Sequence, residues 1–335
     1  MRDAHFGPAF FTLSAIVVGG ILAIVACALL LPLFQRLHVR QQAYEDAPQT
    51  HQVKTGTPTM GGICFVIALV PLAITPIAST LGLYLLALVA ACAAIGFIDD
   101  VLAVRLGRNR GLRARTKFLL TALIAVIFLR AIDGSTALYP RDVIFTSANT
   151  MLLVPHWLWL LLGIAVITGT THAVNLTDGL DGLAAGTMIF PLGALAIAAM
   201  VLMQSPNEFF SLHVLALPAL LGIGACLGFL VYNRYPAKLI MGDTGSLALG
   251  ALLSGIAILS GEMLLLIVIG GVFVAEAVSV MVQVGYFKLT HGKRIFKMSP
   301  LHHHFELSGW PETRVTTSFW LVSAICSLAG LAIVR

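Results

Sequence analysis

Five aspartates stand out because they lie in almost uncharged surroundings at the ends of long apolar segments. They are Asp99, Asp100, Asp178, Asp181 and Asp243. The chain is 59% hydrophobic and only 10% charged, so acidic side chains are used sparingly. Mg²⁺ prefers carboxylate and phosphate oxygens. Carboxylates placed in this way therefore favour a site where Mg²⁺ meets phosphate at the surface of a bilayer.

The adjacent pair Asp99 and Asp100 ends the third apolar segment. A basic run follows the pair and consists of Arg105, Arg108, Arg110, Arg113, Arg115 and Lys117. Two carboxylates at the C-terminus of a helix repel each other and oppose the helix dipole. That cost favours a role as base or metal ligand, and the alternative is the start of a solvated loop.

A second acidic segment, Asn175–Leu183, joins the fifth and sixth apolar segments. Asn175, Asp178 and Asp181 are three residues apart, so a helical turn would place them on one face. An EF-hand is excluded because its twelfth position would be Ile189 rather than glutamate. The glycines of the segment have the wrong spacing for a dinucleotide-binding fingerprint. A binding segment is predicted, with an ordinary acidic turn as the alternative.

The fourth polar loop leads into the eighth apolar segment. Asp243 and Ser246 stand at the expected start of that helix, where free N–H groups and the positive end of the dipole suit an anion or a metal-bound phosphate. Mg²⁺ usually takes one or two carboxylates and completes its shell with water and phosphate. Asp243 fits this role, although an aspartate that only caps the helix is the alternative.

Two further loops carry polar side chains suited to anions. In the first, Lys54 is a point charge for phosphate, and Thr57 or Thr59 could cap the helix that follows. In the last, the histidines 302–304 offer N–H donors to phosphate or sugar oxygens. Three consecutive histidines cannot all bind one metal ion comfortably.

Two polar residues, Glu276 and Gln283, fall inside the ninth apolar segment. An ionisable residue at membrane depth is a functional hypothesis by default, and a hydrogen bond between helices is the alternative.

The elements that position these residues are predicted to be membrane-spanning helices. Mean hydropathy is +0.96, and a span needs ~20 apolar residues. No charge occurs between Lys54 and Asp99, a stretch too long for one span, which is therefore divided near Pro76. About ten helices follow, at approximately 9–34, 59–77, 81–98, 115–132, 152–174, 183–203, 210–231, 244–260, 263–288 and 316–334. The fold class is all-α and polytopic, with residues 1–335 as one membrane domain.

The distribution of basic residues predicts the orientation. Sixteen of the 20 lysines and arginines lie in the loops around 35–58, 99–117, 232–243 and 287–315. The positive-inside rule makes these loops cytoplasmic, so both termini face outward across a bacterial inner membrane. Topology and anionic lipid explain the pI near 9.1 better than nucleic acid does. The five cysteines lie in apolar segments without CxxC spacing, which predicts buried packing.

Five segments in register carry a resemblance to a known family. They are TPTMGG (57–62), FIDD (97–100), NLTDGLDGLAAG (175–186), NRYPAKLIMGDTGSL (233–247) and PLHHHFELSGWPE (300–312). Together they resemble the phospho-N-acetylmuramoyl-pentapeptide transferases, within the superfamily of polyprenyl-phosphate N-acetylhexosamine-1-phosphate transferases. One such motif alone is weak evidence, but five in the family's order are specific.

The resemblance implies ten helices around a cytoplasmic-side cleft, commonly in a homodimer. It implies Mg²⁺-dependent transfer of phospho-MurNAc-pentapeptide from UDP-MurNAc-pentapeptide to undecaprenyl phosphate, which gives lipid I and UMP in peptidoglycan synthesis. By motif, the catalytic acids are Asp99, Asp100 and Asp243, and Asp243 is the Mg²⁺ ligand. The substrate-binding residues carried over are Lys54, Thr59, Lys117, Asn175, Asp178, Asp181, Asn233, Ser246, Gln283, His302, His303 and His304.

The chain departs from the family pattern at two positions. The family usually has a lysine three residues after the second aspartate, where this chain has Ala103, and a second basic residue where it has Thr55. Arg105, Arg108 or Arg110 could supply the charge.

Two rival functions are retained. A related transferase that uses UDP-N-acetylglucosamine would keep the aspartates. An ion-coupled transporter would need carboxylates near the membrane midplane and an inverted repeat.

Overall fold

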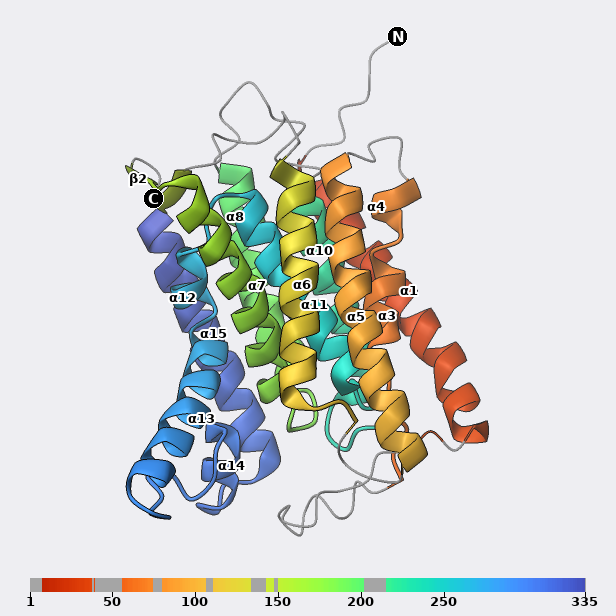
Figure 1. Cartoon of the computed structure of the whole chain (residues 1–335). Coiled ribbons are helices and arrows are strands. Elements are labelled where there is room, and N and C mark those ends of the chain that lie inside the picture. The colour runs from red at the N-terminus through yellow and green to blue at the C-terminus, as the bar shows by residue number, and fades with distance from the viewer. Residues whose placement is uncertain are drawn as a thin grey trace.

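The computed structural model describes residues 8–37, 39, 56–74, 80–106, 111–133, 143–147, 150–201 and 215–334. These residues form a helical bundle with one small antiparallel β-hairpin (Figure 1). The helices are α1 (Pro8–Arg36), α3 (Ile63–Ala68), α4 (Pro71–Ile74), α5 (Thr80–Leu106), α6 (Ala114–Asp133), α7 (His156–Thr177), α8 (Leu183–Val201), α10 (Leu217–Asn233), α11 (Gly242–Leu259), α12 (Leu265–Ile269), α13 (Gly271–Leu289), α14 (Leu301–Glu306) and α15 (Glu312–Val334). The strands are β1 (Val143–Ser147) and β2 (Thr150–Leu153).

Helix α11 lies inside the bundle. Every residue from Thr244 to Leu259 is buried. Beyond Asp243 and Thr244 its sequence contains only glycine, serine and apolar residues, and a helix that is apolar on all sides is an interior helix. Helices α5, α7, α8 and α10 all contact it, so α11 is the element against which the others are aligned.

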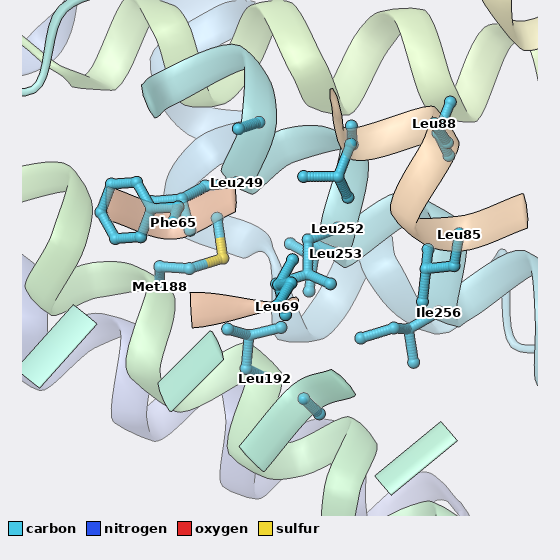
Figure 2. Packing of buried hydrophobic residues seen from close by; sticks show 14 of the residues in the cluster. Phe65, Leu69, Leu85, Leu88, Met188, Leu192, Leu249, Leu252, Leu253 and Ile256 are labelled. Atoms are coloured by element: carbon cyan, nitrogen blue, oxygen red, sulfur yellow. The ribbon is translucent and has the colours of Figure 1, made fainter. Parts of the chain in front are cut away.

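The apolar core fills the space between α11 and its neighbours. Figure 2 shows side chains that interdigitate there, namely Phe65, Leu69, Leu85, Leu88, Met188, Leu192, Leu249, Leu252, Leu253 and Ile256. All ten are almost completely buried. Because packed interiors tolerate little displacement, this core fixes how far each helix extends past α11.

The polar ends of several helices gather at one end of the bundle. At the lower end of Figure 1, α5, α7 and α13 end, while α6 and α11 begin. The start of α1 and the end of α15 lie at the opposite end. Segments far apart in sequence therefore meet at the lower end, which holds the predicted site residues that the structure describes.

The prediction of an all-α, multi-pass membrane protein is confirmed. Seven described helices are long and apolar enough to cross a membrane: those at 10–36, 80–106, 156–177, 183–200, 242–259, 271–289 and 312–333. The predicted total of ten spans stays a prediction, because α3, α6 and α10 are not among the seven.

Two predicted spans are divided, and one begins later than expected. The segment predicted at 59–77 contains α3 and α4, which separate before Pro71, a residue that lacks the N–H of a continuing helix. The segment predicted at 263–288 divides into α12 and α13 at Gly270. The segment predicted at 152–174 begins as strand β2, and helix α7 starts only after Pro155.

The prediction that the third span stops before Asp99 is wrong. Helix α5 continues to Leu106, so Asp99 and Asp100 lie inside the helix rather than at its C-terminus. The helix continues because the residues after the pair are good helix formers and because both carboxylates have partners on other elements. The argument from an unfavourable dipole therefore does not apply to these two acids.

The five cysteines are free thiols, as predicted. Four are buried, and Cys326 is half-buried. Their role in the described structure is packing.

Glycines allow α1 and α10 to approach closely. A side chain at Gly224 of α10 would overlap the carbonyl oxygen of Ile16 in α1. Small residues at helix contacts are typical of membrane bundles, where close packing replaces the hydrophobic effect.

We expect Gly224→Ala to force α1 and α10 apart and to lower stability by about 1–3 kcal/mol. Gly169→Ala in α7 is the matched control, because no atom lies within 4 Å of the added methyl group. It should be neutral or stabilising by up to ~1 kcal/mol, since alanine is the better helix former. Thermal unfolding in detergent measures both variants, and equal melting temperatures for the two would contradict the packing argument.

Glu262 is a buried carboxylate outside the spanning helices. It lies in the turn between α11 and α12 and is 2% exposed. Burial raises the pKa of Glu262 from 4.5 to about 7, and Ser260 lowers that pKa in part. The folded protein therefore binds this proton more tightly than the unfolded chain does.

Because unfolding releases this proton, the stability contribution of Glu262 falls as pH rises from about 4.5 to about 7. We expect Glu262→Gln to raise the melting temperature relative to wild type at about pH 8, and to do so much less at about pH 5. Thermal scans of both proteins at each pH test this, and a difference that does not depend on pH would contradict it.

Candidate active site

Three aspartates from two helices form a compact acidic cluster. Asp99 and Asp100 of α5 and Asp243 of α11 each offer an oxygen within 4.8 Å of the others. Asp99 and Asp100 are buried, whereas the side chain of Asp243 is 22% exposed. Gly96 allows this approach, because a side chain there would overlap the backbone of Asp243. The cluster combines two of the predicted acidic segments.

The Asp100 carboxylate caps the N-terminus of α11. Its Oδ1 accepts the backbone N–H of Asp243 at 3.0 Å. Its Oδ2 accepts the backbone N–H and the hydroxyl of Thr244 at 3.0 and 2.6 Å. Gly242 has φ +71°, a left-handed conformation that turns the chain into this contact. The sequence predicted an anion or a metal-bound phosphate at this helix terminus, and the anion that the structure places there is the Asp100 carboxylate.

Lys117 and Asn175 hold the other acids. Lys117 Nζ of α6 lies 2.7 Å from Oδ2 of Asp243 and 3.5 Å from Oδ1 of Asp99. Asn175 Nδ2 of α7 donates to Oδ1 of Asp243 at 2.8 Å and to Oγ of Ser246 at 2.9 Å. Asp99 Oδ1 also accepts the backbone N–H of Leu112 at 2.6 Å. Four helices thus converge on one site.

The charges of this site do not balance among its own members. Three carboxylates face one ammonium group, and removing charge from water is costly unless it is compensated. A divalent cation compensates two negative charges, and carboxylate oxygens are the donors that Mg²⁺ prefers. The acidic cluster therefore fits a divalent ion, with Asp243 its most accessible ligand.

One residue of α7 near Lys117, His172, was not predicted from the sequence. His172 of α7 stacks on Phe118, and its Nε2 lies 3.4 Å from Oγ1 of Thr121. The signal in the sequence is that His172 stands three residues before Asn175, on the same side of α7.

The predicted helical face of Asn175, Asp178 and Asp181 is wrong. Helix α7 ends at Thr177, and Asp178 occupies the position after it. Asn175 points to the acidic cluster, whereas Asp181 Oδ2 accepts the N–H of Ala237 at 2.9 Å. The three residues share a segment but contact different elements.

Asp181 and Asn233 fasten two polar loops together. Asn233 Oδ1 accepts the N–H of Gly182 at 3.0 Å, and its Nδ2 donates to the carbonyl of Leu239 at 2.9 Å. Glu312 of α15 accepts the backbone N–H of Asp181 at 2.7 Å. Glu312 is a contact that the sequence reasoning did not assign, although it belongs to the PLHHHFELSGWPE segment.

Gln283 and the histidines form a second group on α13 and α14. Gln283 Oε1 accepts the N–H groups of Ile295 and Phe296, so it holds the chain between these helices. His304 Nδ1 accepts the N–H of Lys297 at 3.1 Å, and His303 Nδ1 lies 2.8 Å from Glu306. His302 is buried and reaches the segment after α7, where a side chain at Gly179 would overlap its ring.

The first polar loop is described only in part. Thr59 is buried, and its Oγ1 lies close to Gly242, beside the acidic cluster. The prediction that Thr57 or Thr59 caps the next helix is wrong, because α3 follows Gly62 without a side-chain cap. The predicted Lys54, like Thr55, lies outside the described residues. Ala103, the other departure from the family pattern, lies within α5, one turn beyond Asp100.

Comparison with known proteins identifies the family. Residues 82–261 match the model of glycosyl transferase family 4. A protein of Desulforamulus reducens named phospho-N-acetylmuramoyl-pentapeptide-transferase is 45% identical over 90% of this chain and 89% of its own length. Proteins of the same name from Oceanobacillus iheyensis and Desulforudis audaxviator are 42% and 43% identical, over 96% and 94% of this chain and 97% and 96% of their own lengths. The chain belongs to the phospho-N-acetylmuramoyl-pentapeptide transferases of glycosyl transferase family 4.

The family 4 match covers only part of the candidate active site of this transferase. The family 4 match runs from α5 through α11, so it contains the acidic cluster, Lys117 and Asn175. It ends before Gln283 and the histidines at 302–304. The match to the Oceanobacillus iheyensis relative extends over 96% of this chain, which is long enough to include these residues. The site therefore divides into a part inside the family 4 match and a part outside it.

The cap on α11 can be tested in this transferase without substrate. Asp100→Asn should lower stability by about 1–2 kcal/mol, because an amide cannot accept all three hydrogen bonds of the carboxylate. Thr244→Val removes only the hydroxyl bond and should have a smaller effect. Thermal unfolding of both variants without metal measures this. A more stable Asp100→Asn protein would mean that repulsion within the acidic cluster outweighs the cap.

Proposed function

We propose that this transferase moves phospho-MurNAc-pentapeptide from UDP-MurNAc-pentapeptide to undecaprenyl phosphate and releases lipid I and UMP. The observation that carries the proposal is the acidic cluster of Asp99, Asp100 and Asp243, held against Lys117 and Asn175 at the polar end of a membrane bundle. The names of the full-length relatives agree with this reaction.

The reaction brings two anionic substrates together, so positioning and neutralising charge is most of the catalytic task. Asp243, with Asp99 and Asp100, would hold Mg²⁺, which offsets the charge of the diphosphate when it is bound. Lys117 adds a positive charge beside the same oxygens. Asn175 orients the Asp243 carboxylate through Oδ1, and thereby keeps its position defined.

Direct attack by the lipid phosphate agrees better with this geometry than a covalent aspartyl intermediate does. Both oxygens of Asp243 already have partners, Asn175 on Oδ1 and Lys117 on Oδ2, which makes the carboxylate a poor nucleophile. A phosphomonoester has a second pKa near ~6, so the acceptor is mostly dianionic at neutral pH and needs little activation by a base. The lipid phosphate is therefore assigned as the nucleophile.

The remaining parts of the proposal concern location and assembly. The polar end of the bundle faces the cytoplasm of a bacterial cell, with both termini on the outer side of the inner membrane. The positive-inside rule supports this, because 16 of the 20 lysines and arginines lie in the segments around 35–58, 99–117, 232–243 and 287–315. The protein acts as one domain over residues 1–335 and as a homodimer, which mass spectrometry in detergent would detect.

The first experiment measures UMP release by purified protein in the presence of undecaprenyl phosphate and Mg²⁺. UDP-MurNAc-pentapeptide should support release, and UDP-N-acetylglucosamine should not. Chelation should abolish the activity, and Asp243→Asn should lower it by about a thousandfold or more, since it removes a charged group at the reacting phosphates. Asp133→Asn, at the opposite end of α6, is the control and should retain activity.

The outcomes separate the rival functions. Release only from UDP-N-acetylglucosamine would assign the protein to the related transferases, and release from neither nucleotide by folded protein would overturn the proposal. A phosphorylated Asp243 trapped from the nucleotide substrate alone would replace direct attack by the covalent route.

A further inference from the structure

A buried glutamate and a buried histidine contact each other behind the proposed active site. Glu276 of α13 is 0% exposed, and His302 of α14 is 1% exposed. Glu276 Oε1 accepts the backbone N–H of His302 at 3.1 Å, and its Oε2 lies 3.3 Å from Nδ1 of the same residue. The hydrogen bond to Oε1 compensates part of the cost of burying the carboxylate, whereas Oε2 and Nδ1 lie at ion-pair distance without hydrogen-bond geometry.

This contact determines where the other ring nitrogen of His302 points. Because Nδ1 faces Glu276, Nε2 is directed away from α13, and a side chain at Gly179 would overlap it. Nε2 is buried and hydrogen-bonds with no described residue. Gly179 is therefore a position where only the absence of a side chain allows the histidine ring to contact the backbone.

Gly179 belongs to a short segment, Asp178–Asp181, that connects α7 with α8. One end of this segment continues α7, whose Asn175 binds Asp243. At the other end of the segment, the side chain of Asp181 accepts a hydrogen bond from the backbone N–H of Ala237. The histidine ring supports the segment at Gly179, and Glu312 of α15 accepts the backbone N–H of Asp181, so several separate elements determine its position.

The geometry points to Glu276 and His302 as positioning residues that fix the Asp178–Asp181 segment, which continues from the Asn175 that binds Asp243. Glu276 holds the ring of His302, and the ring supports the backbone at Gly179. Neither residue needs to contact a substrate for this role. The effect on catalysis rests on the proposed function, whereas the effect on the segment does not.

The nucleotide substrate should depend on this support more than the lipid does. The segment lies at the polar end of the bundle, which a water-soluble nucleotide reaches from solution. The lipid acceptor instead approaches from within the bilayer. A displaced segment should therefore lower kcat/KM for the nucleotide and leave KM for the lipid phosphate nearly unchanged.

Hydrogen exchange of the peptide that covers 175–183 tests the support without any substrate. Glu276→Ala should increase the exchange rate of this peptide by about tenfold. Glu276→Gln should stay near the wild-type rate, because its amide can still accept the His302 N–H and can donate to Nδ1. Glu262→Gln removes another buried carboxylate far from this segment and serves as the control.

A compensating pair of substitutions tests the contact at Gly179. Gly179→Ala should increase exchange and lower kcat/KM for the nucleotide by about tenfold or more, because its methyl group displaces the ring. His302→Asn removes the part of the ring that carries Nε2 and should have an intermediate effect. In the double variant, Gly179→Ala should add little to His302→Asn, since the space is then free.

The results decide the proposal as follows. Wild-type exchange in Glu276→Ala, wild-type behaviour of Gly179→Ala, or fully additive effects in the double variant would each overturn it. If Glu276→Ala does not fold, the pair at Gly179 and His302 decides alone. Because exchange needs no turnover, an inactive wild-type protein would contradict the proposed function and leave this test intact.

Discussion

The contact between Asp100 and the N-terminus of α11 is the interaction on which the rest of the site depends. One carboxylate accepts two backbone N–H groups and one hydroxyl, which joins α5 to the central helix of the bundle. The contact needs a buried anion at a helix N-terminus and a close approach of two backbones, which Gly96 and Gly242 allow. Once it is made, Asp99 and Asp243 have no freedom to move apart.

The cap also explains why the site retains an excess of negative charge. The oxygens of Asp100 accept hydrogen bonds from α11, and among the described residues Lys117 is the one cation that contacts Asp99 and Asp243. A second lysine would neutralise the pair and remove its affinity for a cation. The protein instead leaves the pair undercompensated, which costs stability in the free protein and favours binding of a divalent ion.

The sequence predicted the class of fold and the polar segments, but not which of their side chains form the acidic cluster and which hold neighbouring loops. Apolar segments predicted helices, and the acids at their ends predicted where polar groups would meet, because both follow from composition along the chain. The extension of α5 past Asp99 was not predictable, since it depends on partners from α6 and α11 that are distant in sequence. The same reason explains the missed contact of Glu312, which no local pattern signals, whereas His172 is signalled only by its spacing from Asn175 in α7. The predicted helical face of Asn175, Asp178 and Asp181 does not form, because α7 stops at Thr177 and the helical periodicity ends there.

The polar residues of this end serve two different purposes, and the distinction is visible in their hydrogen bonds. The side-chain amides of Asn233 and Gln283 hydrogen-bond with backbone N–H and carbonyl groups of neighbouring loops. Among the described residues, the Asp243 carboxylate instead accepts hydrogen bonds from the side chains of Lys117 and Asn175, and part of its surface stays exposed. Side-chain hydrogen bonds of this kind act together with backbone hydrogen bonds between the loops, such as that from the Ile240 N–H to the Pro58 carbonyl, in fixing the loops at this end of the bundle. Residues that fasten loops are therefore as necessary to the geometry of the site as the acids that would contact the substrates. Whether a polar motif in such a chain holds loops or binds substrate has to be decided from its hydrogen-bond partners, because its residue types alone do not distinguish the two.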